Sequence, residues 1–370
     1  MLRRRRDRPV PTKGPTVALA GAGMISMIHA IAAEAAGVPI VAVASRSKER
    51  AAERAGQIGC PSVDYSELPA GAAVVLVATP PALHVAQAIN ALRAGASVLV
   101  EKPLATTLAA ADRLVAIADD SSGELVYAEN QAFAPVVNEA LRLIAELGPL
   151  DYLDVRALSP RPNWGDFLQP TWGGGCLFDL GAHPIALALL AAGDDQLESV
   201  TAMIDHAADI DVDDHAVVEL QFTSGLTARV EASWREATTT WDLQASSGTG
   251  VVRAELIPVT GLERNGEPFG LATTPDNVDT FVHDLGYVEQ MRQMRSLIIG
   301  PSGTSTSDPV DIARLMDGRF GRRVLEIICA AYSQAGRAER GDETPEPIPF
   351  RGPRESTPHE LWLEAAGSSQ

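Results

Sequence analysis

The sequence predicts an α/β protein in which a doubly wound parallel sheet is followed by a second α/β domain with a large, mostly antiparallel sheet. From residue 16 to about residue 130, short apolar β-rich runs alternate with helical stretches, a pattern typical of a doubly wound parallel sheet. Over residues 150–158 and 196–257 several β-rich runs occur, one joined to the next by a hairpin turn, and such a meander indicates antiparallel strands.

The first region contains five expected strands and four expected helices. The strands are expected near residues 16–20, 40–44, 73–78, 97–100 and 124–129. The helices are expected near residues 24–36, 47–57, 81–95 and 107–120.

The second region begins with a helix at 135–147, which Gly148-Pro149 ends. The run 216–222 leads through Thr223-Ser224-Gly225 into the run 226–232, which predicts a β-hairpin. Helical periodicity returns at 278–299 and 308–335, and the last 30 or so residues are expected to wrap the surface. The predicted organisation is a disordered basic arm (1–14), a dinucleotide-binding domain (15–130), a substrate-binding and oligomerisation domain (131–345) and a C-terminal extension (346–370).

Charge and cysteine content exclude several classes of function. A formal net charge of -18 argues against a general nucleic-acid or anionic-membrane surface, and no run is long and apolar enough to span a membrane. The three cysteines, Cys60, Cys176 and Cys329, are far apart, so neither a disulfide framework nor a zinc site is expected, and no metal is predicted. A reducing cytoplasm is the simplest compartment. A twin-arginine export signal at Arg3–Arg6 is disfavoured, because the apolar segment after it already supplies the first strand.

A glycine turn follows the first strand and predicts a dinucleotide site. Gly21 permits the tight turn, and Gly23 lets the backbone approach a pyrophosphate. The helix after it, beginning with Met24 and Ile25, directs its N-terminal amides at that phosphate. Ser26 replaces the third glycine of the G-x-G-x-x-G fingerprint, so the motif is incomplete, but the strand before it and the helix after it favour the functional interpretation.

The end of the second strand predicts which dinucleotide is preferred. An NAD site usually has an acidic residue here, whereas this chain has Ser45 followed by Arg46. Serine and arginine can bind a 2′-phosphate, the arginine through charge-assisted hydrogen bonds. NADP is therefore the expected cofactor, with NAD left open, and the alternative is that Arg46 and Lys48 only begin a solvated helix.

Two more strands end in turns at the same edge of the sheet. Thr79-Pro80 follows the third strand, and His84 lies shortly after it; His84 is a candidate cofactor contact, although an ordinary histidine in the first turn of a helix is favoured. Glu101-Lys102-Pro103 follows the next strand. A lysine at a strand's carboxyl end lies where ligands of such sheets bind, and the proline turns the chain there.

A second group of polar residues lies in the segment Trp172–Pro184. A glycine run, Gly173–Gly175, opens a predicted helix on which Asp179 and His183 are four positions apart and so share one face. A carboxylate and an imidazole near a lysine can supply proton transfer and substrate hydrogen bonds. A helix pair that merely stabilises the turn is the equal alternative.

In this order, the glycine turn, Thr79-Pro80, Glu101-Lys102-Pro103 and the Gly-Gly-Gly…Asp179-x-x-x-His183 segment resemble the glucose–fructose oxidoreductase / inositol dehydrogenase / rhizopine-catabolism (Gfo/Idh/MocA) family. The resemblance covers nearly the whole chain from Thr16. It implies a Rossmann domain, then an α/β domain whose large open sheet often packs in dimers or tetramers. It also implies NAD(P)-dependent oxidation or reduction of sugars, polyols and related compounds.

The resemblance implies roles for three residues. His183 would take the proton from a substrate hydroxyl as hydride leaves for the nicotinamide, or return it in the reverse direction. Lys102 would hydrogen-bond the reacting oxygen and stabilise its developing negative charge. Asp179 would orient the substrate.

The substrate itself is expected to be a small sugar-like alcohol or carbonyl compound. Ala186 stands where many relatives have an aspartate, which makes an inositol-like substrate less favoured. Trp164 and Trp172 flank the catalytic segment and are candidates to stack on a sugar face, with packing in the core or a loop slightly favoured. The other pocket candidates are Asn130, Phe133, His283 and Tyr287, the last two on one predicted helix.

Two other classes of function stay open. One is a sensor that binds the dinucleotide without turnover, although such relatives often lose the lysine or the histidine that this chain keeps. The other is a redox-neutral lyase or glycosidase with tightly bound NAD, against which Ser45-Arg46 argues mildly.

Overall fold

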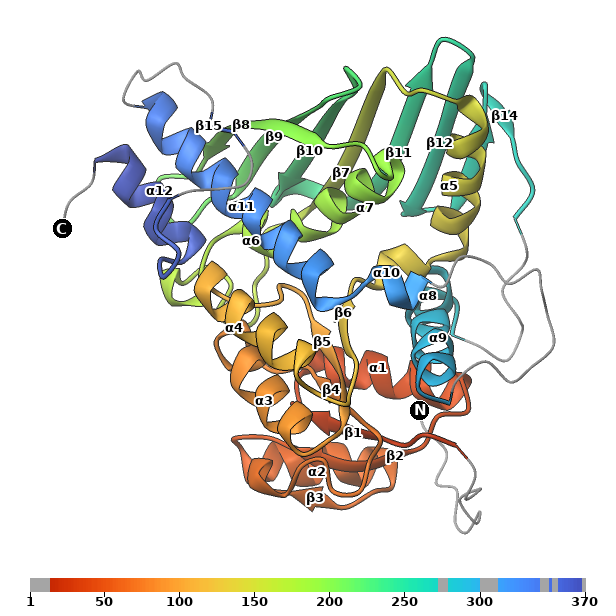
Figure 1. Cartoon of the computed structure of the whole chain (residues 1–370), viewed down its shortest axis with the longest axis vertical. Helices are drawn as coiled ribbons and strands as arrows, with labels where there is room; N and C mark the ends of the chain where they lie inside the picture. Colours follow the sequence, from red (N-terminus) through yellow and green to blue (C-terminus); the bar gives the residue numbers. More distant parts are fainter. Residues whose placement is uncertain (1–13, 272–278, 300–311, 340–345, 348–351, 368–370) are drawn as a thin grey trace. The chain divides into compact units, whose positions relative to one another are not determined.

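The computed structural model describes residues 14–271, 279–299, 312–339, 346–347 and 352–367 (Figure 1). The chain divides into two compact units, which are described one at a time. The first unit comprises the described residues of Met1–Leu104, Arg113–Asn130 and Pro275–Phe320. The second comprises the described residues of Ala105–Asp112, Gln131–Thr274 and Gly321–Gln370. Residues 1–13 of the expected basic arm lie outside the described residues.

The first unit is built on a six-stranded parallel sheet with the strand order β3-β2-β1-β4-β5-β6. The order reverses between β1 and β4, and at such a switch point an α/β sheet binds ligands beyond the carboxyl ends of its strands. The strands are β1 (Val17–Ala20), β2 (Ile40–Ala44), β3 (Ser62–Val63), β4 (Val74–Val77), β5 (Ser97–Glu101) and β6 (Leu125–Ala128).

Helices follow these strands as the sequence predicts, because each apolar strand ends in a turn that starts a helix. Ser47 caps α2 by accepting a hydrogen bond from the Arg50 amide, and Pro81 opens α3. The helices are α1 (Met24–Ala35), α2 (Lys48–Ile58), α3 (Pro81–Arg93), α8 (Thr280–Asp284), α9 (Tyr287–Ile299) and α10 (Ile312–Leu315), together with α4 (Leu108–Asp119), of which the part from Arg113 belongs to this unit.

The helix expected over residues 278–299 is wrong as a single element. Leu285 and Gly286 separate α8 from α9, and Gly286 has a φ of +87°, a left-handed conformation that ends a helix. Further along the chain, residues 308–311 of the expected helix 308–335 lie outside the described residues, and α10 is a separate element from the helix after it.

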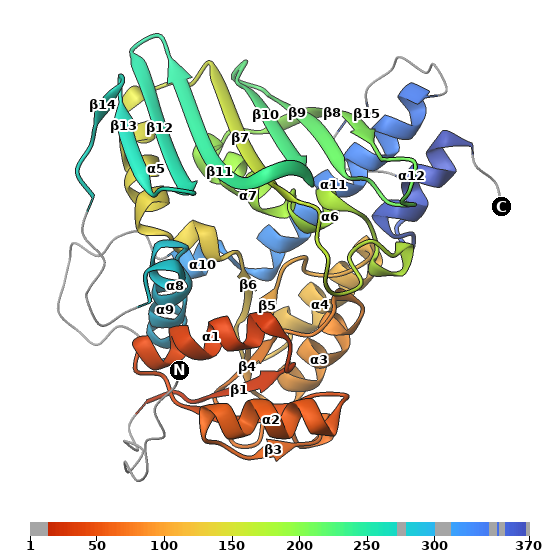
Figure 2. The same ribbon diagram turned by 180° about the vertical axis from the view of Figure 1, so that it is seen from behind.

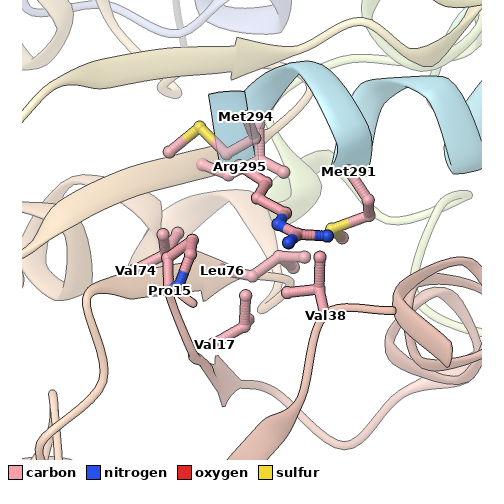
Figure 3. A pocket seen from close by; sticks show the side chains of 9 residues that line it. Pro15, Val17, Val38, Val74, Leu76, Met291, Met294 and Arg295 are labelled. Carbon is pink, nitrogen blue, oxygen red and sulfur yellow. The ribbon is translucent and has the colours of Figure 1, made fainter. Parts of the chain in front are cut away.

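Helix α9 covers the edge of the parallel sheet where β1 and β4 begin. Figure 3 shows Met291, Met294 and Arg295 of α9 facing Val17 and Leu76. The apolar gap between them measures about 10 Å³, which is too small for a ligand. The opposite edge, where the strands end, carries the polar residues described below.

The second unit is built on a nine-stranded sheet with the order β14-β13-β12-β11-β7-β10-β9-β8-β15. Among the described strands of this sheet, the β7–β10 pair alone is parallel, so the mostly antiparallel sheet predicted from the sequence is confirmed, and β9 and β10 form the expected hairpin. The strands are β7 (Tyr152–Pro160), β8 (Leu197–Asp205), β9 (His215–Phe222), β10 (Thr227–Ser233), β11 (Arg235–Ser247), β12 (Gly250–Ile257), β13 (Gly261–Arg264), β14 (Glu267–Pro268) and β15 (Glu346–Pro347).

Helices cover one face of this sheet, with α5 packed on β12 and α7 packed on β7 and β10. Figure 2 shows the other face, which no helix of the described residues covers. The helices of this unit are α5 (Pro135–Leu147), α6 (Cys176–Asp179), α7 (Ala182–Ala192), α11 (Gly318–Glu339) and α12 (Pro358–Ala366).

The end of the chain contains a helix that the sequence did not predict. Thr357 and Glu360 form a capping box at the start of α12, and Leu361 and Trp362 are buried. Helix α12 packs closely on α11 at Gly336, where a Cβ would lie 2.5 Å from the Ala365 Cβ, so only glycine leaves enough room.

Within the described residues, no single helix has the length and apolar composition to cross a membrane, and one bent pair, Pro170–Asp179 with Ala182–Ala192, meets that test jointly.

Candidate active site

The glycine turn after β1 has the geometry that a bound dinucleotide requires. Gly21 has a φ of +129°, and a Cβ there would lie 2.2 Å from the Ala78 carbonyl oxygen, so only glycine fits. A Cβ at Gly23 would meet nothing within 4 Å, so the space in front of this turn is open. Ser26 is buried and donates a hydrogen bond of 2.6 Å to the Gly23 carbonyl. It thus braces the turn at the position of the missing third glycine.

A pocket of about 240 Å³ adjoins this turn. Arg54 of α2 donates a hydrogen bond of 3.0 Å to the Gly23 carbonyl, and the Met24 side chain is 56% exposed at the start of α1, where Ile25 is half-buried. The pocket is lined by Ala22, Gly23, Met24, Arg50, Glu53, Arg54 and Gln57. The first amides of α1 and the two arginines make this a suitable place for a phosphate.

Ser45 and Arg46 lie just past the end of β2, at the same edge of the sheet as the glycine turn. Both contact the Tyr65 phenol, Ser45 through its side chain and Arg46 through its backbone. Burial raises the pKa of Tyr65, and these two contacts oppose that rise. Since Arg46 is exposed, its guanidinium can reach an anion in solution.

Thr79 and Pro80 lie just past β4, and His84 ties this turn to the next strand end. The two ring nitrogens of His84 lie 2.8 Å from the Thr79 carbonyl oxygen and 2.8 Å from the Pro103 carbonyl oxygen. His84 is 1% exposed, and its two contacts join these turns to each other. Burial lowers the pKa of His84.

The catalytic candidate Lys102 follows Glu101, the last residue of β5, whose side chain anchors the turn. The Glu101 carboxylate lies 2.5 Å from His29 Nε2 and accepts a hydrogen bond of 3.1 Å from the Lys102 amide. Burial opposes ionisation of Glu101, but its hydrogen bond to His29 holds its pKa below the ordinary value. Tyr287 packs edge-on against the His29 ring, with 5.3 Å between the ring centroids. The backbone of Lys102 is therefore fixed from inside the unit.

The side chains of the remaining candidates, which come from both units, are buried or make contacts within the protein. Asn130 donates a hydrogen bond of 2.7 Å to the Leu285 carbonyl, and Phe133 is fully buried. His283 lies 2.9 Å from the Asp284 carboxylate. His283 and Tyr287 belong to different helices, so the prediction that they share one helix is wrong.

In the second unit, the glycine run before α6 allows the chain to pack on a buried aspartate. A Cβ at Gly175 would lie 2.0 Å from the Asp213 carbonyl oxygen, and one at Gly174 would lie 2.5 Å from the Phe178 Cβ. Asp213 is fully buried and accepts hydrogen bonds from the amides of Gly175 and Leu177, from the Cys176 thiol and from the Tyr332 hydroxyl. Burial raises the pKa of Asp213, and these donors oppose that rise.

Asp179 and His183 do not share one continuous helix, which corrects the prediction. Asp179 ends α6, and His183 lies in the first turn of α7, after a break at Leu180–Gly181. The segments Pro170–Asp179 and Ala182–Ala192 are bent by 44° at this break, and Gly181 lies close to Leu177, since a Cβ there would lie 2.4 Å from the Leu177 carbonyl oxygen. His183 is 5% exposed and stacks on Trp241, with 5.6 Å between the ring centroids.

The segment before the glycine run holds three aromatic side chains in contact. Trp164 packs edge-on against Phe167 at 4.7 Å, and Phe167 lies 4.5 Å from Trp172, measured between ring centroids. Trp172 belongs to a short 3₁₀ helix (Pro170–Trp172), and Trp164 is 51% exposed. Such a platform can stack on the apolar face of a sugar or another ring.

The structure thus gathers the predicted residues into two groups, one in each unit. Within the first unit, Gly21, Ser45, Thr79 and Lys102 follow β1, β2, β4 and β5 at one edge of the sheet. Within the second, Trp172, Asp179 and His183 lie along one segment. No cluster of three or more potential metal ligands occurs among the described residues.

Sequence reasoning missed the residues that support these groups. They are His29, Asp213, Tyr332, Trp241 and Phe167. His29 and Glu101 are 72 positions apart, and Tyr332 and Asp213 are 119 apart, so no local pattern links them. Asp213 and Asp214 before a strand were the one visible signal, since adjacent carboxylates at the start of a buried strand need partners.

Comparison with known proteins identifies the family. Residues 16–128 match the model of an oxidoreductase family with an NAD-binding Rossmann fold, Gfo/Idh/MocA, and residues 137–251 match the C-terminal domain model of the same family. Among solved structures, GenD2 from gentamicin A biosynthesis in complex with NAD superimposes with a TM-score of 0.75 at 25% identity, over 93% of this chain and 99% of that one.

Curated relatives agree with this match. The dTDP-3,4-didehydro-2,6-dideoxy-alpha-D-glucose 3-reductase of Streptomyces violaceoruber is 34% identical over 52% of this chain and 61% of its own length. The D-xylose 1-dehydrogenase (NADP(+)) 2 of Haloferax volcanii is 32% identical over 58% of this chain and 67% of its own. The matches therefore span about three-fifths to two-thirds of these relatives. On both domain models, this chain belongs to the Gfo/Idh/MocA oxidoreductase family.

Proposed function

We propose that this chain is an NADP-preferring dehydrogenase or reductase that acts on a sugar-like alcohol or carbonyl substrate. The observation that carries the proposal is the placement of Lys102 at the end of β5, at the same sheet edge as the glycine turn. The turn fits a dinucleotide for two reasons. The Ala78 backbone leaves no room for a side chain at position 21, so the turn stays tight, and the space in front of Gly23 is open. A bound nicotinamide would supply the acceptor or donor of hydride.

Three side chains would perform the protein's part of the reaction. In the oxidative direction, His183 takes the hydroxyl proton of the substrate, and in reduction it returns that proton. Lys102 donates a hydrogen bond to the reacting oxygen and stabilises its negative charge. Asp179 orients the substrate. The anchoring of the Lys102 amide by Glu101 supports this role, because a fixed backbone limits the positions that the ammonium can take.

Ser45 and Arg46 support the preference for NADP, since neither repels a 2′-phosphate and Arg46 is exposed at the end of β2. We expect Arg46→Ala to weaken NADP binding by about 10- to 100-fold and to leave NAD binding within about 2-fold. Fluorescence titration of both cofactors measures this. Arg93→Ala, at the far end of α3, is the matched control. Equal losses for the two cofactors would contradict a 2′-phosphate contact.

The substrate class is supported by relatives and by the aromatic platform. The names of the relatives include a xylose dehydrogenase, a dTDP-sugar reductase and a UDP-N-acetylglucosamine 3-dehydrogenase. Trp164, Phe167 and Trp172 would stack on a ring of such a compound. Ala186, in place of the aspartate common in relatives, disfavours an inositol-like substrate.

A turnover assay with NAD and NADP in parallel, against sugars, polyols, ring ketones and nucleotide sugars, tests the function. Oxidation or reduction of one of these compounds with NADP is the expected result. Cofactor binding without turnover would instead indicate a sensor. Cofactor that survives purification, with substrate conversion and no net change in its absorbance, would indicate a redox-neutral lyase or glycosidase.

The face of the nine-stranded sheet that no described helix covers supports a homodimer or homotetramer. It presents alternating charges in pairs, such as Arg229 with Asp154 and Arg156 with Asp242, and the exposed Met203 lies on β8. Light scattering at micromolar protein is expected to give a dimer or tetramer, and a monomer would contradict it. The three unpaired cysteines support a reducing compartment, which we propose is the cytoplasm.

A further inference from the structure

The indole ring of Trp241 stacks on the ring of His183 in the second unit. Their centroids are 5.6 Å apart and their planes are inclined by 34°. Trp241 lies on β11, in register with Ala157 of β7 and Ile257 of β12. Its indole N–H is buried and makes no hydrogen bond within the part of the chain that the structure describes.

The neighbouring strands present apolar side chains on this face of the sheet. Toward the helices, β7 directs Val155 and Ala157, and β10 directs Val230 and Ala232, all buried. The charged side chains of these strands alternate onto the other face, where they pair with one another. The ionisable side chain on the adjoining segment α6 is Asp179, which favours a positive charge nearby.

A positive charge on His183, which is 5% exposed, would thus meet little water and would lie beside the indole ring. The face of an indole carries the negative end of its quadrupole and attracts a cation within about 6 Å of its centroid. The separation of 5.6 Å meets this limit. An apolar environment strengthens such an attraction, because water screens it less.

We propose that Trp241 is a positioning residue for His183 that holds its ring and supports the positive charge it gains with a proton. The inference rests on the proposed role of His183. In the oxidative direction the substrate O–H bond would break as an N–H bond forms on His183, and a bound nicotinamide would supply the acceptor for the hydride, with its electron pair, that leaves the substrate carbon. The imidazolium formed in that step is the species that the indole face stabilises.

Replacement of Trp241 by a residue without a ring tests this. In Trp241→Leu, the acid limb of the pH profile of kcat/KM for oxidation is expected to move to lower pH, on the order of 0.5–1 unit. The maximal kcat should fall by about 3- to 10-fold, with cofactor affinity within about 2-fold. Trp241→Phe keeps an aromatic face and should move the limb by less than half as much. An unmoved limb in Trp241→Leu would overturn the proposal.

A second measurement on the full chain needs no substrate. The ring protons of His183, identified by their absence in His183→Gln, can be titrated by NMR in the wild type and both Trp241 variants. The titration midpoint is expected to fall in the order Trp, Phe, Leu. If Trp241→Leu does not fold, the smaller shift in Trp241→Phe decides the matter. A shifted midpoint with no turnover on any substrate would refute the proposed function and leave this inference standing, whereas equal midpoints would refute the inference.

Discussion

Gly21 and Gly23 belong to the same turn, but a side chain has no room at the first and open space at the second. Their replacement by alanine should therefore have different effects. In Gly21→Ala, the new Cβ meets the Ala78 carbonyl oxygen in a backbone conformation that disfavours side chains. The free energy of unfolding should therefore fall by about 2–4 kcal/mol. In Gly23→Ala, the Cβ meets no protein atom, so stability should be unchanged within about 0.5 kcal/mol.

The effect of Gly23→Ala should appear in cofactor binding instead. Its methyl group occupies the space through which a pyrophosphate would approach the backbone, so the cofactor Kd should rise about 10-fold or more. Denaturant unfolding and fluorescence titration of both variants separate the two effects. If Gly23→Ala binds NADP as the wild type does, the dinucleotide does not approach this turn.

His183 provides the corresponding test of the chemistry. His183→Ala should lower kcat by about 10²–10⁴-fold, the usual contribution of a positioned acid or base, and should leave the cofactor Kd within about 2-fold. His206→Ala, which removes an exposed histidine of the same unit, is the matched control and should keep wild-type kcat. Steady-state kinetics with the substrate found in the turnover assay measures both. Wild-type turnover in His183→Ala would remove it from the mechanism.

At the same scale, the sequence predicts residues whose role depends on local chain geometry. Gly21 is predictable because a tight turn between a strand and a helix requires glycine, and Lys102 because it follows a buried strand directly. The supports of these residues are not predictable in this way. His29 anchors Glu101, and Trp241 stacks on His183, across distances in sequence that only the tertiary fold closes.

Among the elements, α6 depends on a single buried side chain, that of Asp213. Only four residues long, it cannot be stable alone, and Asp213 satisfies the amides of Gly175 and Leu177 at its start. The Tyr332 hydroxyl donates to the same carboxylate from α11. The position of Asp179, at the end of α6, follows from this network.

Replacement of Asp213 by Asn should therefore destabilise the second unit more than loss of one of its donors. The amide NH₂ of Asp213→Asn faces N–H and O–H donors, so at least one buried pair is left unsatisfied, and the free energy of unfolding should fall by about 2–5 kcal/mol. Tyr332→Phe removes one hydroxyl and should cost about 1–2 kcal/mol. Equal losses in urea unfolding of the two variants would contradict the network as described.

Elements were predictable where one apolar pattern ran without interruption. The expected helix 135–147 is observed as Pro135–Leu147, and the hairpin of β9 and β10 has the expected turn. Two of the expected helices that prove to be interrupted share a cause. Gly181 and Gly286 interrupt patterns that remain periodic across them, because the flanking residues pack on either side of the break. Periodicity records which side chains are buried, and it does not record whether the backbone is continuous.

At the scale of the molecule, the switch from alternating strands and helices to a meander predicted both sheets. It did not predict their extent, since β13, β14 and β15 are short, and β15 pairs with β8 from more than 140 positions away. Segments remote in sequence also complete both units: α9 adjoins β1 in the first, and α12 packs on α11 in the second. Pairings of this kind are decided by the apolar surface that remains to be covered, which a local pattern does not reveal.

Each unit contains a buried histidine, which predicts how the stability of the whole chain depends on pH. Burial lowers the pKa of His84 in the first unit and of His359 in the second below the ordinary value of 6.5. Below pH 6.5 these two rings become protonated in the unfolded chain, whereas in the folded chain they stay neutral to a lower pH. The contribution of these two rings to stability is therefore fully present above about pH 6.5 and is lost as the pH falls toward their lower folded values.

Two carboxylates extend this loss to lower pH. His29 holds the pKa of Glu101 below its ordinary 4.5, and His215 with Arg229 lowers that of Glu231 to about 2. Their stabilisation is present above pH 4.5 and is lost as the pH falls through the folded values.

Calorimetry from pH 8 to 5 tests the contribution of the two histidines. It should show both units melting at lower temperature as the pH falls, with a weaker dependence for the first unit in His84→Gln. A Tm that is constant from pH 8 to 5 would mean that these rings are protonated in the folded chain as readily as in the unfolded one.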